Sequence, residues 1–161
     1  MALVYISSAT LAIGQGEKET IRVIVNEHVL PRFEMLADKS AYLAQVAQRD
    51  CVARSELLRA AYANAFDAWI AASHLRFGPT EIDDRAYALA FWPDSRGYTP
   101  KTLKTLIRTK DPIVQKVEDY AEVSISARGF YALEFLIYDP VLSVEGEDQY
   151  RCDLVQTIAE D

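Results

Sequence analysis

Apolar residues recur at helical spacing along most of this chain. Between about Glu17 and Gln48 they fall three or four positions apart, which is the period of an amphipathic helix. Their stripe comprises Ile21, Ile24, Val25, Val29, Phe33, Leu36, Leu43 and Val46. Pro31 interrupts the segment, and proline removes a backbone donor and clashes with the preceding turn. We therefore expect one long helix that is kinked or broken at Pro31.

A second helix is predicted from about Val52 to Leu75. Ser55 or the preceding Asp50 can cap its start, and Gly78-Pro79 stops it. Many alanines in this segment favour the helix and allow a neighbouring helix to approach closely.

The pattern is looser in the next third of the chain. A short helix is expected around Asp84 to Ala90, followed by an ordered loop in which Phe91 and Trp92 are buried. A further helix from Thr99 to Arg108 begins with a capping threonine followed by proline, and Asp111-Pro112 repeats that start signal.

The remaining segments also favour helices. The strongly apolar stretch from about Ser124 to Tyr138 is predicted to be a central buried helix, and a last helix begins near Gln149. No alternating strand pattern is evident. Four main helices with short accessory ones predict an all-α, up-down helical bundle.

Composition narrows the function classes. The chain has 161 residues, 50% of them hydrophobic, which suits one compact domain or half of a two-part protein. Its net charge is −7 and no Lys/Arg cluster offsets it locally, so a phosphate backbone would be repelled. Nucleic acid is therefore not an expected partner.

The first residues, 1–16, carry no charge and are rich in apolar side chains. This stretch is too short to span a bilayer, so no transmembrane segment is expected. It suits the apolar part of a secretory signal, or alternatively a short arm packed on the domain. Residues 17–161 form the predicted helical bundle.

Two cysteines, Cys51 and Cys152, do not form a short-spaced metal motif. They are either two separate buried thiols or one disulfide. In an exported protein such a disulfide would stabilise the fold by on the order of 4 kcal/mol.

Candidate catalytic groups are scarce. His28 is interpreted as a partly buried or surface helix histidine, with a role in metal binding as the alternative. His74 is interpreted as a residue that complements a helix end. Neither a Ser/His/Asp arrangement nor a glycine-rich phosphate loop is recognisable.

The most informative stretch runs from Arg128 to Glu134. Tyr131 and Glu134 share a helix face, and burying a carboxylate in so apolar a segment is costly unless it is paired or binds a cation. One interpretation is a structural network of Tyr131, Glu134 and Arg128. Gly129 disfavours a helix, which suggests a packing or site requirement.

These residues resemble the signature of the imelysin family, also called imelysin-like peptidases. The family motif is Gly-x-His-x-x-Glu, and here the phrase reads Gly129-Phe130-Tyr131-Ala132-Leu133-Glu134. Further matching pieces are Leu30-Pro31, Phe77-Gly78-Pro79, Phe91-Trp92-Pro93-Asp94 and Arg151-Cys152.

The resemblance implies a fold of two helical-bundle halves related by duplication, of which this chain covers the N-terminal half. A C-terminal half of the same protein is then an expected partner. The resemblance also implies export to the periplasm, with anchoring as a lipoprotein in some members, and a link to the uptake of iron or other metals.

Tyr131 departs from the family pattern, because it stands where the motif has histidine. A phenol with a pKa near 10 is a poor ligand unless a strong Lewis acid deprotonates it. Tyr131 and Glu134 would suit ferric iron as hard oxygen ligands, or the metal site is lost and no cofactor binds. The sequence therefore favours a protein that binds a metal or small ligand, without enzymatic activity. The alternatives are an imelysin-type metallopeptidase and a structural or interaction bundle without an active site.

Overall fold

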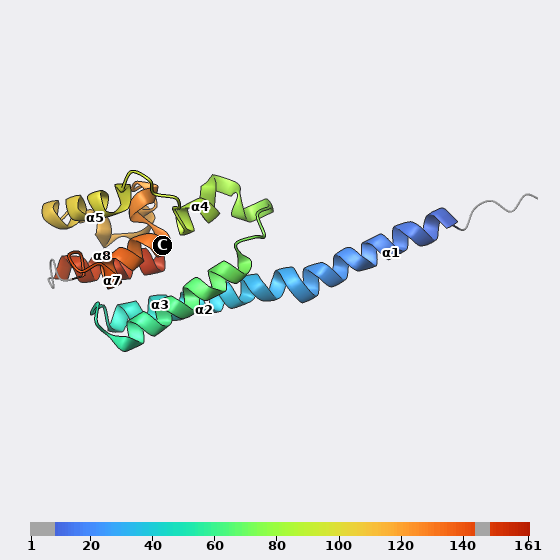
Figure 1. Cartoon of the computed structure of the whole chain (residues 1–161), viewed down its shortest axis with the longest axis horizontal. Coiled ribbons are helices and arrows are strands. Elements are labelled where there is room, and N and C mark those ends of the chain that lie inside the picture. Colours follow the sequence, from blue (N-terminus) through green and yellow to red (C-terminus); the bar gives the residue numbers. More distant parts are fainter. Residues whose placement is uncertain (1–8, 144–148) are drawn as a thin grey trace, which may run out of the picture.

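The computed structural model describes residues 9–143 and 149–161, and every regular element in this part of the chain is helical. The predicted all-α fold is confirmed. A long N-terminal helix and the helix after it form one layer, and the C-terminal helices form a second layer against it (Figure 1).

The long N-terminal helix has three parts, α1 (Ala9–Ile24), η1 (Val25–Val29) and α2 (Leu30–Arg49). The middle part is a π-helical turn, in which the backbone N–H of Leu30 donates to the carbonyl of Val25. Pro31 lies in the first turn of α2, directly after this widened turn. The interruption predicted at Pro31 is therefore a π turn, a single-turn feature that often marks functional sites.

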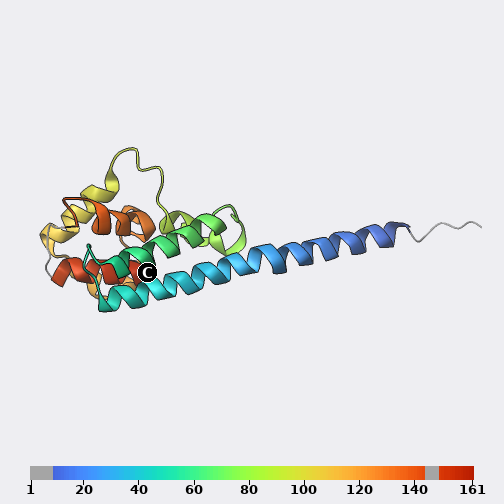
Figure 2. The same ribbon diagram turned by 60° about the horizontal axis from the view of Figure 1, so that its bottom comes forward.

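The N-terminal part of this helix extends beyond the rest of the molecule (Figures 1 and 2). The apolar stripe predicted from the sequence is buried only from Leu43 onward, while Ile21 and Ile24 are 61% and 51% exposed. Of the predicted leader or arm, residues 1–8 lie outside the described part, and the rest belong to α1. No helix among the described residues has the length and apolar character needed to cross a membrane.

Helix α3 (Glu56–Ala72) returns along α2, as Figure 2 shows. Ser55 caps it by accepting the backbone N–H of Leu58 at 3.2 Å. The predicted Ser55 cap is thus confirmed. Its buried alanines, which allow the close approach to α2, are Ala61, Ala65, Ala68 and Ala72.

The second layer contains α5 (Tyr98–Thr109), α7 (Gly129–Tyr138) and α8 (Gln149–Glu160). Helix α8 packs against both α2 and α7, so the core lies between the two layers. The short connecting elements are η2 (Gly78–Thr80), η3 (Ile82–Asp84), α4 (Arg85–Leu89), η4 (Pro112–Gln115), α6 (Val117–Tyr120) and η5 (Ile125–Ala127).

The loop before α5 differs from the prediction in one aromatic residue. Trp92 is 66% exposed, whereas Phe91 is half-buried and contacts the ring of Tyr87. The carboxylate of Asp94 accepts the backbone N–H groups of Tyr98 and Thr99, each at 2.8 Å. Because Asp94 satisfies these free donors, α5 starts before the predicted capping threonine.

Candidate functional site

The helix predicted from Ser124 to Tyr138 is in fact two elements. A 3₁₀ turn, η5, is followed by Arg128 in extended conformation, and α7 begins only at Gly129. The motif residues therefore occupy the first turns of α7 instead of the middle of a long helix.

Gly129 is required at this position for two reasons. Its φ angle is +67°, which side-chain-bearing residues rarely adopt. A β-carbon here would also collide with the carbonyl oxygens of Ala88 and Leu89 at the end of α4. Gly129 therefore allows α7 to begin in direct contact with α4, which is a packing role.

Arg128 does not pair with Glu134. Its guanidinium forms two hydrogen bonds of 2.8 Å to the carboxylate of Asp161, and its Nη1 donates to the carbonyl of Ala121. The predicted network of Tyr131, Glu134 and Arg128 is wrong, because Arg128 lies ahead of α7 in extended backbone and points toward the end of α8.

Glu134 is exposed, so its predicted burial is also wrong. Helix α7 buries a different face, made of Phe130, Leu133, Leu136 and Ile137. No hydrogen bond or ion pair joins Glu134 to another residue of the described part of the chain. Its carboxylate is therefore available to a ligand or to another protein surface.

Tyr131 lies next to Glu134 on α7 and is half-buried. Its ring packs edge-on against Phe66 of α3, with ring centroids 6.0 Å apart. Burial raises the pKa of the Tyr131 phenol, and the negative charge of Glu134 raises it further. The phenol is therefore protonated at neutral pH and is less suited to binding a metal than a free tyrosine.

Aromatic rings extend this surface along the seam between α3 and α7. Tyr62 contacts Phe66, Phe130 and Tyr138, with centroid distances between 5.7 and 6.1 Å. Burial raises the pKa of Tyr62, and the charge of Glu134 adds to this effect. The carboxylate of Glu134 therefore lies close to a row of aromatic rings that includes the neutral phenols of Tyr62 and Tyr131.

These residues do not form a complete metal site by themselves. The described part of the chain contains no group of three or more His, Cys, Asp or Glu side chains that could hold a metal ion. Glu134 offers one carboxylate, and Tyr131 offers a phenol whose raised pKa opposes deprotonation. Any metal bound here needs further ligands from outside the described residues.

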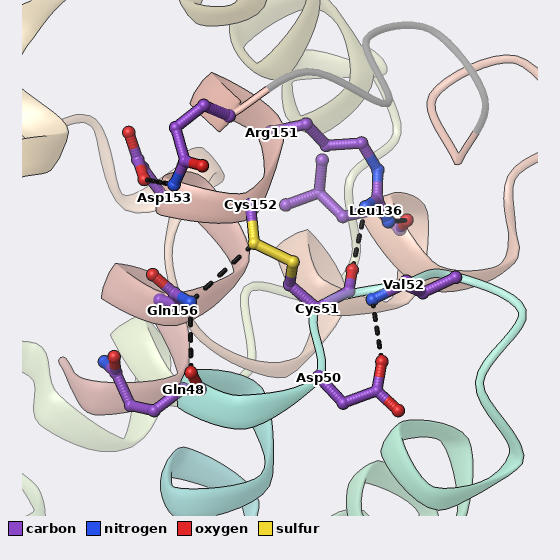
Figure 3. Close-up of a disulfide and its surroundings, with 10 residues drawn as sticks. Gln48, Asp50, Cys51, Val52, Leu136, Arg151, Cys152, Asp153 and Gln156 are labelled. Carbon is purple, nitrogen blue, oxygen red and sulfur yellow. Dashed lines mark hydrogen bonds between the residues drawn. A yellow bond between two sulfur atoms is a disulfide. The ribbon is translucent and has the colours of Figure 1, made fainter.

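Cys51 and Cys152 form a disulfide in the structure, with Cα atoms 5.3 Å apart. Figure 3 shows that this bond joins the turn between α2 and α3 to the first turn of α8. Gln156 adds a second connection, because its amide lies 3.5 Å from the carbonyl of Gln48. The two layers of the bundle are thus linked covalently at one end.

Arg151 strengthens the same junction from inside the core. Its side chain is 3% exposed, and it donates to the carbonyl of Cys51 at 2.9 Å and to the carbonyl of Leu136 at 2.6 Å (Figure 3). Leu136 lies in the last turn of α7, where free carbonyl groups favour a positive charge. The Arg151-Cys152 pair therefore joins three segments of the fold.

The structure also brings together two residues that no sequence pattern pairs. His28 in η1 and His74 after α3 approach with their Nε2 atoms 2.9 Å apart. His28 is a half-buried histidine on a helical element, as predicted, but its contact with His74, across 46 positions of sequence, was not predicted. An apolar pocket of about 390 Å³ has Val29, Phe77 and Trp69 among its lining residues, and neither histidine lines it.

Comparison with known proteins places these features in a family context. The model of a family described as imelysin matches residues 29–161. No curated protein matches the chain. Among solved structures, the crystal structure of an imelysin-like protein from Psychrobacter arcticum 273-4 is 23% identical in sequence and gives a TM-score of 0.79.

That likeness covers 99% of this chain and 48% of the Psychrobacter chain. This chain therefore spans about half the length of the protein that it resembles.

Proposed function

Because this chain belongs to the imelysin family, we propose that it binds metal for uptake, with iron as the cargo, and that it is not an enzyme. Glu134 supplies one carboxylate to the binding site. The remaining ligands come from a second helical half, or from a small chelator that arrives with the ion.

The exposed carboxylate of Glu134 is the observation that carries this proposal. It stands on the most apolar helix of the chain, beside Tyr131 and Tyr62, and no described residue neutralises it through an ion pair. Hard carboxylate oxygen is a suitable ligand for iron, above all in the ferric state. The raised pKa of Tyr131 favours Glu134 over the phenol as the ligand.

A second helical half is supported by apolar surface that nothing in the described part of this chain covers. Exposed apolar side chains continue along the long N-terminal helix, and they comprise Ile21, Ile24, Leu30 and Met35. Exposed apolar side chains gathered on one helix often mark a surface that packs against a partner. The Psychrobacter protein is about twice as long as this chain, which fits a partner of similar size.

The disulfide supports a location outside the cytoplasm. Structural disulfides persist in oxidising compartments such as the bacterial periplasm and are rare where thiols are kept reduced. We therefore propose that the protein is periplasmic or otherwise exported, where metal ions are captured before entry.

Peptidase activity is the second candidate function. The glutamate of the motif favours it, but Tyr131 replaces the histidine that would act as a borderline metal ligand. Both histidines of the chain are held in the pair between η1 and the end of α3. A third candidate is an interaction bundle in which the Glu134 face contacts only protein.

Iron binding by the oxidised chain tests the proposal. Equilibrium dialysis against ferric citrate and, without oxygen, against ferrous iron should show retained iron, and Glu134→Gln should weaken retention at least tenfold. Glu118→Gln is a matched control, because Glu118 is an exposed glutamate on α6. Equal retention by the parent chain and by the Glu134→Gln variant contradicts the proposal.

Activity is tested separately on unfolded protein substrates. Cleavage by the parent chain above the level of Glu134→Gln would favour the peptidase instead.

A further inference from the structure

His28 and His74 are the only histidines of the sequence, yet the fold places them against each other. His28 comes from the π turn η1 and His74 from the residues that follow α3, so two separate elements are needed to build the pair. The π turn positions His28, and turns of this kind are frequent at functional sites.

We propose that His28 and His74 form a binding site for a transition-metal ion, in which both Nε2 atoms are ligands and water completes the coordination. This site is separate from the one proposed at Glu134. It shares no residue with that site and requires no second helical half.

The two nitrogens are close enough for one ion to bridge them. Metal–imidazole bonds are about 2.0–2.1 Å long, so two nitrogens at right angles around one ion are about 2.9 Å apart, and about 3.4 Å apart in a tetrahedron. The observed separation of 2.9 Å is that of the hydrogen bond between the rings, and it lies within the range that a small rotation of the rings can adjust to either geometry. Square-planar and tetragonal sites with nitrogen ligands are typical of Cu²⁺ and Ni²⁺, and Cu²⁺ binds such ligands more tightly.

The surroundings of His28 favour its neutral form. Partial burial lowers the pKa of His28, and the positive charges of Arg32 and His74 lower it further. Neutral imidazole is the form that binds metal. Without an ion, one ring donates its Nε2–H to the other, so binding requires that proton to move to Nδ1 of the same ring, with no net proton released.

The surroundings of His28 and His74 allow an ion to enter and the rings to turn. His74 is exposed and His28 half-buried, so an ion can reach both rings from solvent. The rings meet end to end, with centroids 5.2 Å apart, and must turn for their lone pairs to converge on one ion. Arg32 donates to the carbonyl of His28 at 3.3 Å, and its positive charge limits the affinity for a cation.

Titration with CuCl₂, NiCl₂ and ZnCl₂ tests the inference on the oxidised chain. We expect one equivalent of Cu²⁺ to bind more tightly than Ni²⁺ or Zn²⁺, and the electron paramagnetic resonance spectrum of bound Cu²⁺ to show nitrogen ligands. His28→Ala and His74→Ala should each weaken Cu²⁺ binding at least tenfold. His74→Gln keeps a polar side chain and is expected to lose Cu²⁺ binding while it remains folded. Circular dichroism checks the folding of each variant.

Glu134→Gln separates the two sites. Cu²⁺ binding that survives this substitution but is lost in both histidine variants supports the pair, whatever the result with iron. Cu²⁺ binding that survives in both histidine variants overturns the inference and leaves the pair as a hydrogen bond between helices. Loss of Cu²⁺ binding in Glu134→Gln alone also overturns it, because the ion then binds at the carboxylate.

Discussion

Arg128 and Asp161 form a two-pronged ion pair, with Nε and Nη2 each 2.8 Å from a different carboxylate oxygen. The pair joins the residue that precedes α7 to the residue that follows α8, across 33 positions of sequence. The side chains are only 21% and 8% exposed, so water screens them less than a surface pair. This contact closes the end of the bundle opposite to the disulfide.

Arg128→Ala should lower the free energy of unfolding by about 1–3 kcal/mol, because hydrogen bonds to charged, partly buried groups are lost. Urea denaturation measures the change. Lys116→Ala is the control, since Lys116 and Asp119 are exposed and 4.0 Å apart. Its expected effect is less than about 1 kcal/mol. Similar losses in both variants would show that Arg128 contributes no more than a surface charge.

Gly129→Ala should be among the most destabilising single substitutions in the chain. Gly97→Ala isolates the backbone contribution, because Gly97 also has a positive φ, +62°, but a β-carbon added there would meet no atom within 4 Å. We expect about 1–2 kcal/mol for Gly97→Ala from the backbone alone. The collision with α4 should add about 1–3 kcal/mol at Gly129. Equal losses in urea denaturation would contradict the close contact with α4.

Reduction of the disulfide should lower the stability of the bundle markedly. The bond joins residues separated by 101 positions, and closing a loop of this size stabilises a fold by roughly 4–5 kcal/mol. Dithiothreitol should therefore lower the midpoint of thermal unfolding in the parent chain. A chain with both Cys51→Ala and Cys152→Ala should unfold at the lower temperature with or without the reductant. An unchanged midpoint for the parent chain under reduction would argue against the bond.

The pKa of Tyr131 should fall when Glu134 is replaced by glutamine. The negative charge of Glu134 opposes formation of the phenolate, so its removal makes deprotonation easier. Nuclear magnetic resonance of ¹³Cζ-labelled tyrosine measures the pKa, and Tyr131→Phe assigns the signal. Glu118→Gln should leave it unchanged. A pKa that stays the same or rises in Glu134→Gln would contradict the electrostatic effect of Glu134 on the phenol.

The same shift has a consequence for stability in alkali. The pKa of Tyr131 is raised in the folded state, so its contribution to stability is present below the ordinary pKa near 10 and is lost as pH rises through the folded-state value. Tyr131→Phe should therefore lose less stability between neutral and strongly alkaline pH than the parent chain.

Periodicity predicted the helices well because each main helix buries a regular apolar stripe. The long N-terminal helix and α3 lie where apolar spacing places them, whereas α7 begins later than predicted. Apolar spacing predicted burial less well, because an apolar stripe on a helix need not contact another part of the chain. Ile21 and Ile24 are exposed for this reason. Trp92, a loop residue that was predicted to be buried, is exposed as well.

The candidate site was only partly predictable. Tyr131 and Glu134 were correctly predicted to lie side by side, because residues three positions apart on a helix share a face. Whether Glu134 is buried depends on how α7 is rotated against α3, which its own sequence does not specify. The partner of Arg128 and the contact between His28 and His74 depend on packing between distant segments, and no local pattern carries that information.

The π turn sets the angular phase between the two parts of the N-terminal helix. Each residue of an α-helix advances about 100° around the axis, so one additional residue in η1 shifts every side chain of α1 by that angle relative to α2. The apolar side chains that α1 offers to a partner thus point in a direction fixed by five residues near the middle of the helix. An insertion or deletion in η1 would rotate α1 about the helix axis, so that its side chains face another direction, without altering a contact in the core.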